Sequence, residues 1–327
     1  MEERILGRTD MAVSVIGLGT WQLGADWGDV TEQDAMAVLD AAASAGISLL
    51  DTADVYGDGR SEQIIGRFLE VNPGAEFTVA TKMGRRVPQD PALYTLENFR
   101  AWTDRSRANL GMDTLDLVQL HCPPTAVYSS DAVYDALDTL VDEQRIAAYG
   151  VSVETCDEAL TAIARPGVAT VQIIFNAFRR KPLDKVLPAA QAAGVGILAR
   201  VPLASGLLSG RYTHGTSFPA DDHRSYNRHG EAFDVGETFS GVDFDTGVEA
   251  AGEFAALAPA GATPAQTALR WILQQPGVTT VIPGARNPEQ ARQSAAAADL
   301  PPLSDATLAA IADLYDERIR AQVHDRW

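Results

Sequence analysis

The chain has 327 residues, and 46% of them are hydrophobic, so it can bury a large core. Its 44 acidic residues outnumber its 26 basic residues, for a formal net charge of −18. This excess argues against nucleic acid or anionic membranes as partners, because neutralising phosphates requires clustered lysines and arginines. The N-terminus has no signal-peptide pattern, and no apolar run approaches the roughly 20 residues of a membrane span. We expect a cytoplasmic protein; its oligomeric state stays open.

Short apolar runs alternate with amphipathic stretches from residue 15 to about residue 300, which is the rhythm of a parallel α/β fold. Eight such runs without a central break in composition favour a closed barrel over an open doubly wound sheet. The sequence therefore predicts one (β/α)8 TIM-barrel domain over residues 1–327. The predicted strands are Val15–Gly19, Leu49–Asp51, Phe77–Lys82, Leu115–Leu120, Ile146–Ser152, Val171–Phe175, Gly196–Arg200 and Val278–Ile282.

Three segments stand outside this repeat. Residues 4–15 form two apolar arms around a polar turn, which predicts an N-terminal β-hairpin, and Ala306–Trp327 is a C-terminal extension. The longest irregular segment, His214–Gly247, follows the seventh strand and so belongs to the face where barrel active sites lie. A loop of this length is functional or disordered. Both a substrate-covering loop and a mobile insertion remain open.

Several helices have recognisable start signals. Thr31 with Asp34 is a capping pair, and Thr95 can cap a helix that Gly111 ends. Later helices have candidate caps at Asp131, Thr155 and Asn287.

The most informative residues follow three of the predicted strands. Asp51 ends one strand, Tyr56 lies in the glycine-containing loop after it, and Ser61 opens the next helix. Lys82 and His121 end two later strands. An Asp–Tyr–Lys–His series in this order resembles the aldo-keto reductases, and the resemblance extends from Leu6-Gly7-Arg8-Thr9 to Ile282-Pro283-Gly284-Ala285-Arg286.

The resemblance implies hydride reduction of a carbonyl with Tyr56 as proton donor. A free phenol has a pKa near 10, so approaching neutrality requires about 3–4 kcal/mol. Lys82 can supply this only if it is close and sheltered from water, because an exposed ion pair contributes about 0–1 kcal/mol. We expect Asp51 to keep Lys82 charged and His121 to orient the carbonyl oxygen.

The chain has no dinucleotide fingerprint, because after Gly17 and Gly19 the third glycine falls two positions late, at Gly24. The resemblance instead implies a nicotinamide cofactor, NADP(H), extended across the barrel mouth. Its implied contacts are Ser152 and Gln172 with the carboxamide, Pro202, Leu203, Ser205, Gly206, Leu208, Gly210 and Arg211 near the pyrophosphate, Gly284 and Arg286 near the 2′-phosphate, and Gln290 and Ser294 near adenine.

The chain departs from the family pattern at two of these positions. Val153 follows Ser152 where many relatives have asparagine, which puts one amide bond in doubt, and Asn176 is a candidate to replace it. The second position is Ser294, where relatives often have asparagine, so the implied contact with adenine is weaker.

The resemblance also implies a substrate pocket lined by Trp21, with Trp27 in the same loop. Apolar walls suit aldehydes and ketones of medium size, and not highly charged substrates. The two cysteines, Cys122 and Cys156, lack metal-ligand spacing, so we expect free thiols and no metal. Two rival functions remain: a Schiff-base aldolase using Lys82, and a cofactor-sensing subunit, since some members of this family regulate ion channels.

Overall fold

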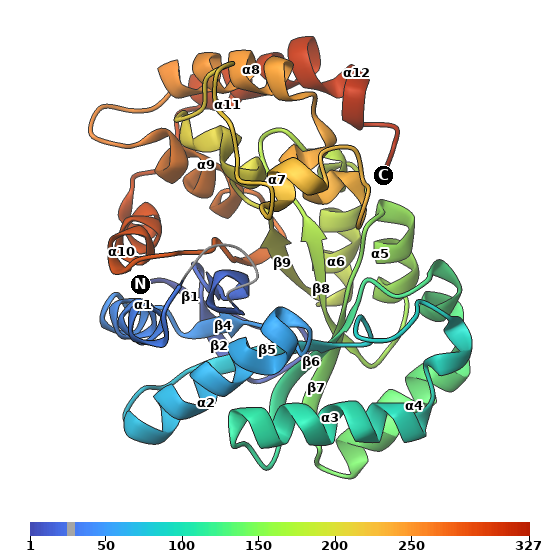
Figure 1. The fold of residues 1–327 in the computed structure, drawn as a ribbon. Coiled ribbons are helices and arrows are strands. Elements are labelled where there is room, and N and C mark those ends of the chain that lie inside the picture. The colour runs from blue at the N-terminus through green and yellow to red at the C-terminus, as the bar shows by residue number, and fades with distance from the viewer. Residues whose placement is uncertain (25–29) are drawn as a thin grey trace.

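Eight parallel strands form one sheet in the part of the chain that the computed structural model describes, residues 1–24 and 30–327 (Figure 1). The strands are β3 (Leu18–Gly19), β4 (Leu49–Asp51), β5 (Thr78–Met83), β6 (Leu115–His121), β7 (Ile146–Ser152), β8 (Val168–Ile174), β9 (Gly196–Arg200) and β10 (Val278–Val281). Parallel bridges Ile16–Val281 and Gly19–Gly284 join the two edges of the sheet. The predicted barrel is therefore confirmed.

The predicted strand positions hold to within a few residues. The largest differences are at β8, which begins three residues before the predicted Val171, and at the first strand. Only Leu18 and Gly19 pair with β4. The residues just before them bond instead to β10, at the other edge of the sheet. Val15 accepts a hydrogen bond from the Val281 N–H at 3.0 Å.

Helices surround the strands, and the late helices α8, α11 and α12 lie together on one side of the molecule (Figure 1). Within the described residues the helices are α1 (Glu32–Ser44), α2 (Arg60–Val71), α3 (Leu96–Leu110), α4 (Asp131–Asp142), α5 (Cys156–Ile163), α6 (Val186–Ala193), α7 (His223–Tyr226), α8 (Phe244–Ala256), α9 (Pro264–Leu273), α10 (Pro288–Ala295), α11 (Asp305–Leu314) and α12 (Arg320–Val323). The extension after residue 305 is thus helical. No helix in the described ranges is both long enough and apolar enough to cross a membrane.

Most predicted caps are found at helix starts. Thr31 and Thr155 each form a capping box, Thr95 accepts the Asn98 N–H, and Asn287 accepts the Gln290 N–H at 3.0 Å. Gly111 ends α3 with φ 67°, a left-handed conformation that favours glycine.

Two of the predicted helix starts are wrong by one residue. Asp131 is the first residue of α4, not its cap, and its carboxylate pairs with Arg165 instead. Helix α2 begins at Arg60, so Ser61 lies inside the first turn.

The predicted hairpin consists of β1 (Glu3–Ile5) and β2 (Ala12–Ser14), which pair antiparallel. Leu6 and Val13 from this hairpin join an apolar cluster inside the barrel with Leu49, Ala80, Leu117, Leu198 and Ile282. Arg8 donates to the carbonyl oxygens of Arg165 and Pro166, which precede β8. The hairpin therefore closes the barrel at the amino ends of its strands and leaves the carboxyl ends open for the site.

Candidate active site

Asp51 and Lys82 form a buried ion pair at the carboxyl ends of the neighbouring strands β4 and β5. Lys82 Nζ lies 2.7 Å from Asp51 Oδ2 and donates to the Thr52 carbonyl oxygen at 2.8 Å. The two side chains are 1% and 5% exposed, so little water screens their charges. The sheltered lysine that the sequence argument requires is present.

The Tyr56 hydroxyl lies at hydrogen-bonding distance from this pair. Lys82 Nζ is 3.4 Å from the Tyr56 oxygen and 5.1 Å from the centre of its ring. Tyr56 reaches this position through a turn in which its N–H bonds to the Ala53 carbonyl oxygen at 3.1 Å. Asp51, Tyr56 and Lys82 are thus brought together although they come from two strands and a loop.

Buried hydroxyl groups hold the loop that carries Tyr56. Thr52 Oγ1 and Ser61 Oγ are 2.9 Å apart, Ser61 Oγ is 2.9 Å from Thr20 Oγ1, and Thr20 donates to the Asp51 carbonyl oxygen at 2.9 Å. This network explains why Ser61 faces inward. Gly24 approaches the same loop so closely that an added Cβ would lie 2.9 Å from the Tyr56 carbonyl carbon. This close approach explains why a glycine stands at position 24, two positions later than the dinucleotide fingerprint requires.

His121 ends β6 and completes a tetrad of side chains, Asp51, Tyr56, Lys82 and His121. Its ring meets the Tyr56 ring edge-on, with centroids 5.9 Å apart. It is 5% exposed, and its Nδ1 has no hydrogen-bond partner among the described residues. The ring therefore has a buried nitrogen that no described protein group satisfies.

The electrostatics of these side chains differ in one respect from the sequence argument. Burial raises the pKa of Tyr56 above its ordinary value; Lys82 opposes this rise, while Asp51 adds to it. The phenol therefore stays protonated, and the expected approach of its pKa to neutrality is not found. Burial lowers the pKa of Lys82, but Asp51 and Tyr56 outweigh this effect and the net pKa is raised, so the expected role of Asp51 is supported. Burial and then the charge of Arg85 hold the pKa of His121 well below its ordinary value, so this imidazole is neutral.

The two residues predicted to hold the carboxamide lie beside the tetrad. Ser152 pairs in register with His121 across β6 and β7, and Gln172 pairs with Ser152 across β7 and β8. The Gln172 amide also donates to Asp51 Oδ1 at 2.7 Å, a contact that the sequence did not suggest.

Asn176, the candidate to replace the asparagine missing at Val153, already uses its side chain elsewhere. Its amide donates to the Val201 carbonyl oxygen at 2.9 Å and to Ser240 Oγ at 2.7 Å, and its oxygen accepts the Phe178 N–H. We therefore assign Asn176 to holding the backbone and not to a ligand.

The predicted pyrophosphate segment follows β9 as a kinked turn. Ala204, Ser205 and Gly206 have φ values of 48°, 55° and 100°, so the chain is left-handed over these three positions. Backbone strain of this kind is concentrated at ligand sites. Pro202 and Leu208 are buried, Leu203, Ser205 and Gly206 are half-buried, and Gly210 and Arg211 are exposed at the far end. The residues of this segment are small and partly accessible, so a phosphate group can approach their backbone N–H donors.

The predicted adenosine end of the site lies at the start of α10. Arg286 is exposed, and its N–H bonds to Gln290 Oε1 at 2.8 Å. Its guanidinium also lies 3.9 Å from Asp222 Oδ2. Gly284 is exposed, and Gln290 and Ser294 are half-buried on the same side of the barrel. The donor set of Arg286 and a helix N-terminus suits a phosphate group.

Segment 214–247 packs against the site and is not structureless. It contains α7, two short turns of 3₁₀ helix at Val235–Glu237 and Phe239–Gly241, and the first turn of α8. His223 and Phe233 from this segment contact Trp21, with ring centroids 5.5 and 6.2 Å away, and Trp21 stacks on Tyr56 at 6.0 Å. Trp21 therefore lies beside Tyr56, where the sequence predicts a wall of the substrate pocket, whereas Trp27 lies outside the described residues.

A second charged group adjoins the tetrad, and sequence reasoning missed it. Arg85 Nη2 donates to Glu237 Oε1 at 3.0 Å, and Arg200 Nη2 lies 2.9 Å from Glu154 Oε2. Cys122 Sγ lies within 4.8 Å of carboxylate oxygens of Glu154 and Glu237. The two arginines already pair with these carboxylates, which does not favour a metal there. The signal available in the sequence was Arg85, a second cationic side chain only three residues after Lys82.

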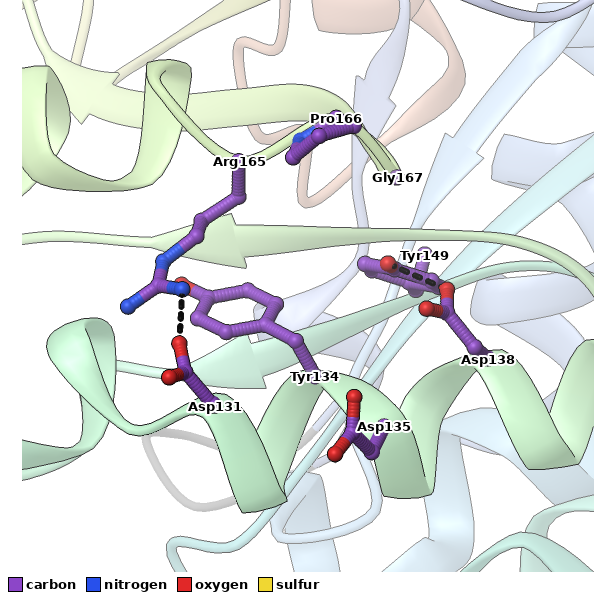
Figure 2. A pocket seen from close by; sticks show the side chains of 8 residues that line it. All are labelled: Asp131, Tyr134, Asp135, Asp138, Tyr149, Arg165, Pro166 and Gly167. Atoms are coloured by element: carbon purple, nitrogen blue, oxygen red, sulfur yellow. Dashed lines mark hydrogen bonds and ion pairs between the residues drawn. The ribbon is translucent and has the colours of Figure 1, made fainter.

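A separate pocket of about 190 Å3 lies between α4 and the residues that precede β8, at the closed end of the barrel (Figure 2). Its lining residues are Asp131, Tyr134, Asp135, Asp138, Tyr149, Arg165, Pro166 and Gly167. Arg165 pairs with Asp131, and the Tyr149 hydroxyl donates to Asp138 Oδ1 at 2.6 Å (Figure 2). This pocket contains no member of the tetrad.

The sequence model of the aldo/keto reductase family matches residues 15–316. The chain belongs to this family. It is 31% identical over 296 residues to the aldo-keto reductase YhdN of Bacillus subtilis, covering 89% of this chain and 86% of that protein. The family assignment agrees with the four side chains described above: Asp51, Lys82 and His121 lie at strand ends, and Tyr56 lies in the loop after β4, as the resemblance implies.

Solved structures of this family have the same fold. The glycerol dehydrogenase AKR11B4 from Gluconobacter oxydans superposes with a TM-score of 0.79 at 30% identity, covering 99% of this chain and 97% of that one. An aldo-keto reductase from Klebsiella pneumoniae in complex with NADPH superposes with a TM-score of 0.72 at 26% identity, covering 96% of both chains.

Proposed function

We propose that the protein is an NADP(H)-dependent oxidoreductase that reduces aldehydes or ketones to alcohols, or runs the reverse reaction, with Tyr56 as general acid or base. One observation carries this proposal: Lys82 Nζ lies 2.7 Å from Asp51 and 3.4 Å from the Tyr56 hydroxyl, and the side chains of the ion pair are almost fully shielded from solvent. The NADPH-bound relative and the exposed Arg286 support the choice of cofactor.

Each side chain has a defined task in this proposal. The bound nicotinamide supplies or accepts the hydride. Neutral His121 orients the carbonyl oxygen toward Tyr56, whose phenol donates the proton as negative charge develops on that oxygen. Lys82 then stabilises the phenolate, and Asp51 keeps Lys82 charged. Ser152 and Gln172 hold the carboxamide, and residues 202–211 with Arg286 hold the phosphates.

The Schiff-base aldolase is disfavoured by the surroundings of Lys82. An amine nucleophile requires a lowered pKa, but Asp51 and Tyr56 outweigh burial and raise the pKa of Lys82. Its Nζ also bonds to the Thr52 carbonyl oxygen. A cofactor-sensing subunit would bind NADPH with slow turnover, and a steady-state assay separates it from the reductase.

The test is a screen of aldehydes, diketones, sugars and steroids for NADPH consumption, with Tyr56→Phe as the comparison. We expect the substitution to lower turnover by about 10²–10⁴-fold, while fluorescence titration finds NADPH affinity nearly unchanged. A loss of general acid catalysis lowers the rate by at least about 100-fold. If Tyr56→Phe retains more than about a tenth of wild-type turnover, the loss is too small and the assignment of Tyr56 is wrong.

A further inference from the structure

Arg85 is held at the mouth of the site by the turn that follows β5. Gly84 has φ 103°, and an added Cβ there would lie 3.0 Å from the Tyr94 ring, so the backbone angle and the close approach both favour glycine. The turn directs Arg85 back over the strand ends, where its Nη1 lies 3.5 Å from His121 Nε2. Its side chain is 26% exposed and therefore accessible to a ligand.

The two terminal nitrogens of Arg85 face different groups. Nη2 bonds to Glu237, while Nη1 faces His121. A carbonyl oxygen bonded to His121 Nε2 would lie about 3 Å from that atom. A group a few bonds from that carbonyl can then meet Nη1 without displacing Glu237.

The charges around Arg85 favour a negatively charged group. Arg85 and Arg200 are both cationic and share the carboxylates of Glu154 and Glu237. Burial raises the pKa of Glu154 to about 8, and the charge of Glu237 adds to this rise although Arg200 opposes it. Glu154 therefore favours its uncharged form more than an ordinary glutamate does, which weakens its compensation of the two arginines.

We propose that Arg85 determines substrate choice: it selects aldehydes and ketones that carry a carboxylate a few bonds from the carbonyl carbon. This inference rests on the proposed function, and it differs from the expectation from the sequence that highly charged substrates do not suit the site. Charge-assisted hydrogen bonds between guanidinium and carboxylate supply both affinity and orientation.

The test compares substrates that differ mainly in charge: pyruvate against methyl pyruvate, and succinate semialdehyde against its methyl ester. The quantity measured is the ratio of kcat/KM for the acid to kcat/KM for the ester. We expect wild type to favour the acids. Arg85→Met should lower the ratio by about ten- to hundredfold, mainly through KM. Arg85→Lys should lower it less, because lysine keeps the positive charge but lacks the paired N–H donors of the guanidinium.

Arg86→Met is the matched control, because Arg86 pairs with Asp58 outside this group, and its ratio should equal that of wild type. An equal loss for acids and esters in Arg85→Met would overturn the inference, since Arg85 would then only hold Glu237. Efficient reduction of the esters but not the acids by wild type would also overturn it and leave the proposed function standing. Failure of every carbonyl compound would instead refute the proposed function.

Discussion

The amide of Gln172 donates to Asp51 Oδ1 at 2.7 Å, while Lys82 bonds to the other oxygen of the same carboxylate at the same distance. Both oxygens of the buried Asp51 are therefore bonded, which orients the carboxylate toward Lys82. The family resemblance assigned Gln172 to the cofactor alone. In this structure it links the predicted carboxamide site to the tetrad.

Gln172→Leu is expected to lower kcat/KM by about 10–100-fold, because a buried hydrogen bond to a charged group contributes about 1.5–3 kcal/mol. Steady-state kinetics measures this loss. Gln119→Leu is the control, since the Gln119 amide lies 3.4 Å from the same oxygen and makes the weaker bond. An equal or larger loss in Gln119→Leu would contradict the role given to Gln172.

Asp51 and Lys82 are expected to act as one unit. Lys82→Met removes the cation from Tyr56, and Asp51→Asn leaves a buried ammonium without its counter-ion, so each should disable the same step. The double mutant should be scarcely slower than the slower single mutant, because groups that act together are not additive. A double-mutant cycle on kcat tests this. Strictly additive losses, or a substrate adduct trapped on Lys82 by borohydride, would refute the mechanism.

Arg286→Ala should weaken NADPH binding and leave NADH binding nearly unchanged, because only NADPH carries the 2′-phosphate. The expected loss is about 1.5–3 kcal/mol, the strength of a hydrogen bond between charged groups. Fluorescence titration with both nucleotides measures it. Arg292→Ala provides a control on helix α10, which follows Arg286, since Arg292 is exposed and lies 3.9 Å from Glu289. Equal losses for both nucleotides would exclude the 2′-phosphate as the partner of Arg286.

Asp54→Asn should stabilise the protein above pH 7. Burial raises the pKa of Asp54 from 3.8 to about 7, the charge of Glu62 adds to this rise, and Oδ1 has no hydrogen-bond partner among the described residues. The folded state thus keeps a proton that the unfolded chain loses, so stability falls as pH rises from about 4 to about 7 and stays lower above that. Removing the charge should recover a stability on the order of 2–4 kcal/mol at pH 8 and little at pH 4.

Urea unfolding of wild type and Asp54→Asn at both pH values is the measurement. Asp58→Asn should have the opposite sign at pH 8, because hydrogen bonds from Arg86 and the charge of Arg105 lower the pKa of this exposed carboxyl. Its contribution to stability is present above the ordinary pKa of an aspartate and lost as pH falls. A stability gain for Asp54→Asn that is the same at pH 4 and pH 8 would rule out the titration of Asp54 as its cause.

The sequence alone predicted the barrel, which the structure confirms, and the four residues of the proposed tetrad. Barrel strands are buried on both faces, so they appear as short apolar runs, and a polar residue that ends such a run marks the carboxyl end of the barrel. Asp51, Lys82 and His121 are visible for this reason. Helix caps at Thr31, Thr95 and Asn287 are equally local, because one side chain bonds to a backbone only three residues away.

Tertiary structure alone decided the second charged group and the state of Tyr56. Glu237 meets Arg85 across 152 positions of sequence, through a segment whose composition predicts no contact. Likewise the pKa of Tyr56 depends on how completely the site is buried, and burial here outweighs the nearby lysine. Burial and long-range pairing depend on which residues lie close together in space. The local pattern of residues does not encode either property.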